Sequence, residues 1–411
     1  MLNGVTVQGT VRLSGARIHG TFSLAGATLS GPERDSLIAA RGATVDGDLE
    51  LDNLRASGGT LRFSNTTLSS VVAVGAQLSN PRAVTLSLHQ ATVRGSVVLS
   101  RGFTSTGLVV LTRSTLTGRL ECDRGSFDCP APHEGNEQGH AIEAVSASVR
   151  GGMDLSWTRA SPSVDLTNAS TTFLADDPAS WPERIFISGF SYDRFEPSRR
   201  ADPAGAWDHR TRSAWLARQA VYDAGPYEQA ARVFRQHGYT GAAESILIAQ
   251  RAQARQLIGG RGARPRRALD AVFGATVAYG YRPGRVAWLL AALLVLVLGS
   301  LEIPAAQATL RATNSAGVVY TTRGALEPAG AGHAAAPDVC GGGQVRCFSA
   351  VLYTIDTVIP LVSLEQRSTW YPDPHTPHGA LIEWWLNAAT LLGWLLSSIL
   401  ALSLARLARA S

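Results

Sequence analysis

The sequence predicts a mainly β N-terminal solenoid, a right-handed β-helix, followed by an α-helical hairpin and a two-helix transmembrane region. Three observations predict this order: an eleven-residue repeat at the start of the chain, a helical period from residue 208 onwards, and two long apolar runs near the end. We expect these segments: 1–170 β-solenoid, 171–207 irregular linker, 208–258 helical hairpin, 259–285 basic juxtamembrane or interfacial helix, 286–304 first transmembrane helix, 305–347 extracytoplasmic loop, 348–364 re-entrant or interfacial helix, 365–383 loop, 384–404 second transmembrane helix and 405–411 cytoplasmic tail.

The solenoid prediction rests on the eleven-residue repeat. Two copies are visible in the first 31 residues, at Val11, Leu13, Gly15, Ala16, Ile18 and Gly20, and then at Phe22, Leu24, Gly26, Ala27, Leu29 and Gly31. Apolar residues two apart are typical of a strand that buries one face. The glycines permit a positive φ at the corners, and the small alanine fits a tight inward corner. A unit that cannot bury its own face must stack on its neighbours, so we expect a solenoid rather than a flat sheet.

Three segments interrupt the repeat and are expected to form loops between coils, because each contains proline and polar residues. They are Pro32–Ser36, Ser79–Arg82 and Pro130–Gly139. The alternation fades after about Asp165, and residues 176–205 are rich in Pro, Asp and Arg. This composition predicts the irregular linker.

The period becomes helical from Asp208. Pro226 lies where a helix would begin and Gly238 where it would end. The stretch Pro226–Ala249 has the outline of one tetratricopeptide-like hairpin. A single hairpin is too small for a peptide-binding groove, so we interpret it as a cap on the solenoid and a spacer to the membrane rather than as a binding module.

Two apolar runs, Val286–Leu301 and Trp384–Leu404, approach the length that a bilayer requires. Arginines precede the first run and follow the second, and basic residues are enriched on the cytoplasmic side of membranes. Both runs therefore predict a two-pass protein of the bacterial inner membrane, with both termini in the cytoplasm. A buried hairpin in a soluble domain is the alternative. The expected interface anchors are Arg282, Arg285, Trp288, Trp384, Trp385 and Arg406.

All 37 basic residues are arginine, and the formal net charge is +5. Without lysine the chain cannot carry a Walker A phosphate loop, a Schiff-base nucleophile or a kinase-type lysine. The arginines crowd together before the first apolar run, which indicates membrane topology rather than nucleic-acid binding. We therefore expect the lipid bilayer as a partner, and no nucleic acid.

The four cysteines form two pairs of equal spacing. In the predicted orientation Cys122 and Cys129 lie on the cytoplasmic side, and we expect free structural thiols in or near strands. Cys340 and Cys347 then lie outside, where a disulfide persists, and we expect them to be bridged.

Residues 348–364 carry a single charge, Asp356, and lie between the two spans. The segment forms either an amphipathic helix on the outer leaflet, which we favour, or a re-entrant helix that dips into the membrane, since protein can bury backbone at that depth. It does not match a potassium-channel filter. In the re-entrant case the residues of interest are Asp356, Thr357, Pro360 and Glu365, because an intramembrane carboxylate is rarely idle.

Several stretches carry a resemblance: the GxVxLxGAxIxG units, PYEQAARVFRQHGYTGAAESILIAQR (Pro226–Arg251), VAYGYRPGRVAWLL (Val277–Leu290), VLYTIDTVIPLVSLEQRSTWYP (Val351–Pro372) and LLGWLLSSILALSL (Leu391–Leu404). They resemble a family of actinobacterial membrane proteins with pentapeptide-like solenoid repeats, often labelled membrane-associated oxidoreductases. The resemblance covers nearly the whole chain. It implies a pentapeptide-like fold and an oxidoreductase activity, but assigns no catalytic residue.

The residues themselves carry no motif for that activity. We find no G-x-G-x-x-G between a strand and a helix, and the two cysteine pairs are predicted on opposite sides of the membrane, where they cannot share a cluster. His375 and His378, near Asp373, are interpreted as part of a solvated loop rather than as metal ligands. We therefore expect no cofactor and no metal, and we assign no catalytic residue.

Three hypotheses for function follow. In the first, the solenoid is a rigid cytoplasmic scaffold, held by two helices, that presents its strand faces to a protein partner. In the second, the chain is a subunit of a two-span channel or transport protein, a homo-oligomer around residues 348–364. The third is the redox enzyme that the resemblance implies.

Overall fold

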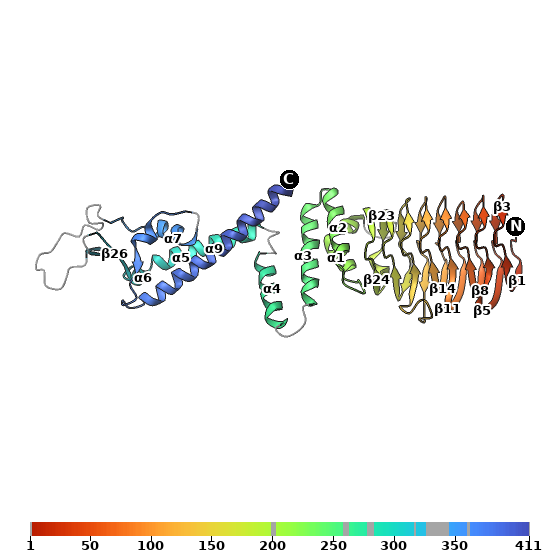
Figure 1. The fold of residues 1–411 in the computed structure, drawn as a ribbon, viewed down its shortest axis with the longest axis horizontal. Helices are drawn as coiled ribbons and strands as arrows, with labels where there is room; N and C mark the ends of the chain where they lie inside the picture. The colour runs from red at the N-terminus through yellow and green to blue at the C-terminus, as the bar shows by residue number, and fades with distance from the viewer. Residues whose placement is uncertain are drawn as a thin grey trace, which may run out of the picture. The chain divides into compact units, whose positions relative to one another are not determined.

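The computed structural model describes residues 2–198, 203–257, 263–277, 283–315, 318–325, 345–359 and 362–410. These residues form two compact units, Met1–Ile258 and Gly259–Ser411, which are described separately below (Figure 1).

The first unit begins with a stack of parallel strands, drawn from red to yellow in Figure 1. One sheet of 11 strands contains β1 (Thr6–Gln8), β2 (Val11–Arg12), β5 (Thr28–Ala39), β8 (Arg55–Arg62), β11 (Gln77–Ser87), β14 (Thr104–Val110), β17 (Ser126–Asp128), β18 (His140–Glu143), β21 (Arg159–Ser161), β22 (Ser163–Asp165) and β24 (Arg184–Phe186). A second sheet of 14 strands contains β3 (Arg17–Ile18), β4 (Phe22–Ser23), β6 (Thr44–Val45), β7 (Leu49–Glu50), β9 (Thr67–Leu68), β10 (Val71–Val72), β12 (Thr92–Val93), β13 (Val97–Val98), β15 (Thr115–Leu116), β16 (Leu120–Glu121), β19 (Ser148–Val149), β20 (Met153–Leu155), β23 (Ser170–Asp176) and β25 (Ser191–Pro197). The predicted solenoid is confirmed.

The register shows that the repeat is half a coil. Thr6 of β1 pairs with Thr28 of β5, which is two repeats further along the chain. Some coils are longer, because Arg17 pairs with Thr44 and Thr115 pairs with Ser148, whereas the late pair Ser170 and Ser191 returns to the shorter spacing. Each coil buries its alternate residues in one continuous core. An eleven-residue half-coil does not support the pentapeptide-like description that the resemblance implies.

The repeated glycines have two physical roles. In the turn Leu24–Ala27 the amide of Ala27 donates to the carbonyl of Leu24 at 3.0 Å, and Gly26 has φ +68°, a region open to glycine at little cost. Gly118 instead allows close stacking, since a Cβ there would lie 2.4 Å from the backbone of Gly95 in the preceding coil. Ala27 is fully buried, as predicted for the inward corner.

Two of the three predicted loops are wrong. Pro32–Ser36 lies inside β5 and Ser79–Arg82 inside β11, where the extra residues are taken up as shifts of register between parallel strands. Continued pairing satisfies backbone groups that a loop would expose. Pro130–Gly139 does lie between strands β17 and β18.

The solenoid also extends beyond the predicted boundary at residue 170. β24 pairs with β22 and β25 pairs with β23, so Arg184–Phe186 and Ser191–Pro197 form strands where we expected an irregular linker. Ile185, Ile187, Phe190 and Tyr192 are buried and keep the spacing of the repeat, with phenylalanine at the alanine position. The Pro- and Asp-rich insertion before them, which contains the 3₁₀ helix Pro178–Ser180, hides this last coil in the sequence.

Helices close the C-terminal end of the solenoid. They are a 3₁₀ helix at Pro203–Trp207, α1 (His209–Leu216), α2 (Gly225–Gln236) and α3 (Thr240–Gln256). We call α1–α3 the helical cap. Its buried residues, Phe234 of α2 among them, belong to the same core as the strands. Ile185 of β24 donates to the carbonyl of Arg218 and accepts from the amide of Ala220, both at 3.0 Å, so the chain after α1 pairs with the end of the sheet. This covers backbone groups that an open edge would leave unpaired.

The second unit contains α4 (Ala263–Val277), α5 (Pro283–Leu301), α6 (Pro304–Gln307), α7 (Ala350–Val358), α8 (Gln366–Thr369) and α9 (Gly379–Ala410). A four-stranded antiparallel sheet joins β26 (Leu310–Thr313), β27 (Val319–Thr321), β28 (Gly324–Ala325) and β29 (Tyr371–Pro372). Segments 305–347 and 365–383 are therefore not plain loops.

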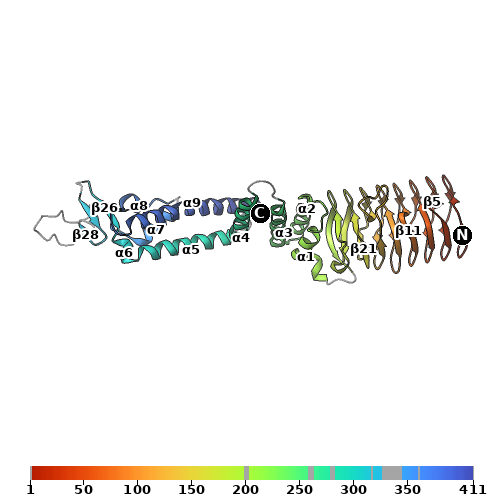
Figure 2. The same cartoon turned by 90° about the horizontal axis from the view of Figure 1, so that it is seen from below.

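Figure 2 shows α5 and α9 side by side, with α6, α8 and the small sheet near one end of the pair. Two stretches are long and apolar enough to cross a membrane, Gly284–Leu301 of α5 and Gly379–Ala405 of α9. Both lie close to the predicted spans, although the second helix begins five residues before the predicted Trp384. Helices α5 and α9 expose tryptophan and leucine side chains, which are better solvated by lipid than by water.

Candidate functional site

The segment between the two apolar helices folds into α7, which packs against both α5 and α9. Ser349 caps its start, since its hydroxyl accepts a hydrogen bond from the amide of Leu352. One face of the helix is buried, including Tyr353 and Val358, while Val351 and Leu352 on the other face are 51% and 41% exposed. Helix α7 is thus apolar on both its packed and its open side.

The end of α7 meets the middle of α9. A Cβ on Gly393 would lie 2.1 Å from the carbonyl oxygen of Val358, so glycine is required for this approach. Gly393 lies fourteen residues after Gly379 and twelve before Ala405, the ends of the apolar stretch. At 1.5 Å per residue this places the contact about 21 Å from one end and about 18 Å from the other. Helix α7 therefore reaches the midpoint of the apolar span.

The carboxylate of Asp356 holds the chain that returns from α7. Its two oxygens accept hydrogen bonds from the backbone amides of Leu364, at 3.1 Å, and Arg367, at 2.8 Å. Arg367 in turn donates to the side-chain oxygen of Asn387 in α9 at 3.2 Å. Asp356 thus links α7 to the residues that follow it, and we call this link the latch. We call residues 349–370 the α7 hairpin.

The other residues predicted here have local partners. The hydroxyl of Thr357 donates to the carbonyl of Tyr353 at 2.7 Å, so that hydrogen bond stays within α7. Glu365 adopts a positive φ of 54° and forms an ion pair with Arg346. Pro360 lies outside the described residues.

Two side chains, Trp370 and Gln366, join the two ends of the α7 hairpin through hydrogen bonds to residues 346–349. Trp370 has no exposed surface, and its indole nitrogen donates to the carbonyl of Arg346 at 2.8 Å. The side chain of Gln366 donates to the carbonyl of Cys347 and accepts from the amide of Ser349. Cys347 is disulfide-bonded, while Cys340 lies outside the described residues, so their pairing stays a prediction.

The predicted interface anchors fall at several places. Trp288 and Trp384 are 79% and 77% exposed, whereas Trp385 turns inward and its indole nitrogen donates to the hydroxyl of Ser300 at 3.0 Å. Arg285 is exposed at the start of α5. Arg282 and the side chain of Arg406 lie outside the described residues.

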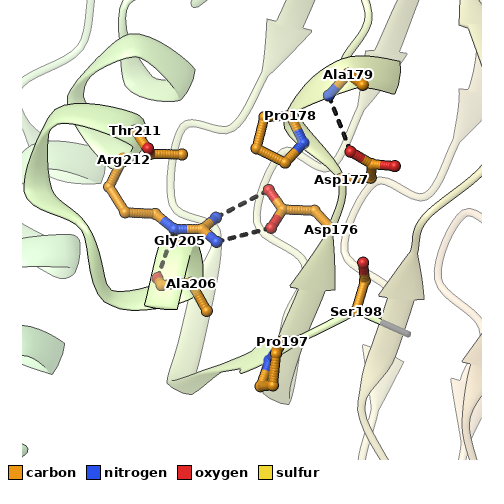
Figure 3. A pocket seen from close by; sticks show the side chains of 10 residues that line it. All are labelled: Asp176, Asp177, Pro178, Ala179, Pro197, Ser198, Gly205, Ala206, Thr211 and Arg212. Atoms are coloured by element: carbon orange, nitrogen blue, oxygen red, sulfur yellow. Dashed lines mark hydrogen bonds and ion pairs between the residues drawn. The ribbon is translucent and has the colours of Figure 1, made fainter. Parts of the chain in front are cut away.

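A second cluster lies where the helical cap meets the last coils (Figure 3). Arg212 of α1 donates to both carboxylate oxygens of Asp176 in β23, at 2.8 Å each, and to the carbonyl of Ala206 at 2.9 Å. Trp181 donates to the same carboxylate, and the guanidinium lies 4.2 Å from the ring centre of Phe195. A cavity of about 250 Å³ adjoins the pair. Because these polar groups already bond one another, we interpret the cluster as a structural clamp.

A third cluster contains the residue types of a hydrolase triad. The ring of His140 lies 3.0 Å from the hydroxyl of Ser163 and 3.8 Å from a carboxylate oxygen of Asp165. The second distance is too long for a hydrogen bond, and Ser163 has no exposed surface to meet a substrate. Burial lowers the pKa of His140. The cluster therefore supports the fold rather than catalysis.

Cys122 and Cys129 are free and buried. Burial raises the pKa of both thiols, which keeps them protonated and poorly nucleophilic. His375 and His378 are exposed in the loop before α9. Among the described residues no three His, Cys, Asp or Glu side chains gather in a way that could hold a metal ion.

Sequence reasoning missed the clamp and the His140 cluster because their members are far apart in the chain. Asp176 and Arg212 are 36 residues apart, and His140 and Ser163 are 23 apart. A usable signal existed for the clamp: Asp176 ends the apolar alternation of β23, and Arg212 lies on the helix face that also carries Trp215 and Leu216.

Comparisons with protein-family models, with curated proteins and with solved structures find no match to this chain.

Proposed function

We propose that this protein is a membrane-anchored scaffold, whose solenoid lies in the cytoplasm of a bacterium and binds a protein partner along its strand faces. The observation that carries this proposal is the single core that runs through all the coils and into the helical cap. Such a stack is stiff along its length and offers an extended lateral surface, which is how solenoid proteins commonly bind partners.

The anchoring is supported by the two apolar helices of the second unit. Their orientation is proposed from the arginines near the start of α5 and the end of α9, since positive charge is retained on the cytoplasmic side. The bacterial inner membrane and the two-pass topology belong to the same proposal.

The test is site-specific photo-crosslinking in cells. A photoreactive residue at Gln77 or Thr104, both exposed on the solenoid, should form an adduct with one protein, identified by mass spectrometry and confirmed by the reciprocal pull-down. The same group at Tyr371, exposed in the second unit, should not give that adduct. Failure to obtain a specific adduct from several solenoid positions would overturn the proposal.

One observation favours a second candidate function, a subunit of a channel-like protein. Helix α7 ends level with Gly393, at the midpoint of the apolar stretch, rather than at its end. Non-helical backbone at that depth is tolerated where protein buries it or where it lines a water-filled path. The C-terminal end of a helix is electronegative and attracts cations. Several copies arranged around their α7 ends would surround such a path.

This candidate is tested with the purified protein in liposomes. A channel should give a cation flux that Asp356→Asn alters, because that change loosens the α7 hairpin, while Asp373→Asn in the loop before α9 should leave the flux unchanged. The oligomer count in detergent is the second readout. A strictly monomeric protein would remove the channel candidate and leave the scaffold. The redox activity implied by the resemblance stays a prediction, which the visible absorbance spectrum of the native protein would check.

A further inference from the structure

Helix α4 lies where the first apolar stretch of the second unit begins. The helix contacts α5, and the apolar stretch Gly284–Leu301 starts at the second residue of α5. Figures 1 and 2 show α4 at the end of the α5–α9 pair that is away from the small sheet, running across the direction of α5 rather than continuing it. A helix that turns across the start of a membrane span lies along the bilayer surface, beside the lipid headgroups.

The charge of α4 is strongly positive. Arg264, Arg266 and Arg267 are exposed, and Asp270 is the single acidic residue in the sequence of the helix. Arg264 and Arg266 form no hydrogen bond or ion pair with a residue in the ranges that the structure describes. The wider segment 259–285 contains six arginines and no acidic residue besides Asp270. This end of the second unit therefore has positive charge that its own carboxylates do not neutralise.

The position of the arginines within α4 favours an anion as their partner. The N-terminal end of a helix is positively polarised, so basic side chains in the first turn are unfavourable unless a negative charge lies nearby. Arg264 is the second residue of α4 and Arg266 is the fourth, and no acidic residue lies in that turn. An anion at this end is attracted both by the two guanidinium groups and by the helix dipole.

The rest of α4 and its surroundings decide which anion fits. Residues 268–277 carry no charge besides Asp270, which suits a helix that rests on acyl chains. A phospholipid presents its phosphate at the membrane surface, where the arginines of α4 lie if α5 crosses the bilayer. A zwitterionic headgroup also carries an ammonium group, which the arginines repel, so the net attraction is greatest for headgroups with a net negative charge.

We propose that Arg264 and Arg266 bind the headgroup phosphates of anionic phospholipids at the surface of the membrane that α5 enters. The planar guanidinium of each arginine donates two parallel hydrogen bonds to phosphate oxygens. The inference rests on the proposed membrane anchoring and names the class of lipid that holds α4. Because α4 lies between the helical cap and α5 in the chain, this binding keeps the last segment before the span on the membrane surface.

The test uses the full-length protein in a neutral detergent and native mass spectrometry, which resolves each bound lipid. Phosphatidylglycerol should bind with an affinity that falls as salt is added, and phosphatidylethanolamine should bind at least about tenfold more weakly. The double variant Arg264→Gln/Arg266→Gln should lower the affinity for phosphatidylglycerol about tenfold or more. The control Arg12→Gln/Arg41→Gln removes the same charge from exposed solenoid positions and should change the affinity less than about twofold.

Each other outcome counts against lipid binding by α4. No binding of phosphatidylglycerol, equal binding of the two lipids, or an equal loss in the control variant would overturn the inference. Displacement of the lipid by an equal concentration of glycerol 3-phosphate would show that a soluble phosphate suffices, and would overturn the choice of a lipid. If the α4 variant binds the lipid unchanged while crosslinking from Gln77 captures a partner, the lipid inference fails and the scaffold stands. Unchanged circular dichroism of both double variants shows that the fold is kept.

Discussion

Arg212 and Asp176 form two parallel hydrogen bonds of 2.8 Å, and both side chains are almost completely buried (Figure 3). The pair joins α1 of the helical cap to β23, which lies between β19 and β20 in the 14-stranded sheet. The cap is therefore attached to the solenoid by a specific polar contact as well as by apolar packing.

Breaking this pair on one side should be costly. Arg212→Met leaves the carboxylate of Asp176 buried with Trp181 as its remaining side-chain partner, and we expect a loss of about 3–5 kcal/mol in the free energy of unfolding. The double variant Asp176→Leu/Arg212→Met should recover most of that loss, because no unpaired charge remains. Hydrogen exchange of residues 170–216 measures both effects. As a control, Arg194→Met breaks a half-exposed pair with Glu196 and should cost no more than about 1 kcal/mol.

The contact between Val358 and Gly393 gives a second prediction. Gly393→Ala places a methyl group against the carbonyl of Val358, so α7 must move away from α9, at a cost of about 1–3 kcal/mol. The amides of α7 should then exchange faster in detergent. Gly299→Ala, in α5, has open space at its Cβ and should leave the exchange of α7 unchanged. Unaltered exchange in Gly393→Ala would contradict the close approach.

The hydrogen bonds of Asp356 give a third prediction. Asp356→Asn replaces a carboxylate that accepts two backbone hydrogen bonds by an amide with one acceptor oxygen, so the amides of Leu364 and Arg367 should exchange about tenfold faster or more. Asp373→Asn serves as the matched change, since Asp373 accepts from the amide of His375 and pairs with Arg311 of β26, and it should affect only that loop and the adjoining small sheet. Equal effects of the two variants on Leu364 would argue against the latch.

His140 gives a prediction about pH. Burial lowers the pKa of the folded His140 below that of the unfolded chain, which takes up a proton near pH 6.5. Below about pH 6.5 the unfolded state therefore binds more protons, and this contribution to stability is lost as the pH falls towards the folded pKa. The free energy of unfolding of the first unit should decrease on acidification, and the slope should be smaller in His140→Gln.

The membrane orientation gives the last prediction. A cysteine placed at Arg323, exposed in the second unit, should react with a membrane-impermeant maleimide on intact spheroplasts, because that segment is proposed to lie outside the inner membrane. A cysteine at Ser57, exposed on the solenoid, should react only after lysis. Reaction of Ser57→Cys in intact cells would reverse the proposed topology.

Local patterns were enough to predict the main elements. Alternating apolar residues with glycine and alanine at the corners predicted the coils, and continuous apolar runs predicted α5 and α9. Both depend on residues within a few positions of one another, which is why a single sequence carries them. Where the pattern was interrupted the prediction erred, as at Pro32–Ser36, because register shifts keep a strand paired despite extra residues.

The contacts that position the candidate sites were decided only by the tertiary structure. The sequence by itself determined that a stacked β domain and two long apolar helices are present, since each follows from periodicity and composition. It could not determine that Arg212 reaches Asp176, that His140 meets Ser163, or that Val358 ends against Gly393 in the middle of α9. Those pairings depend on how coils and helices separated by more than twenty residues are brought together, and no local spacing encodes that.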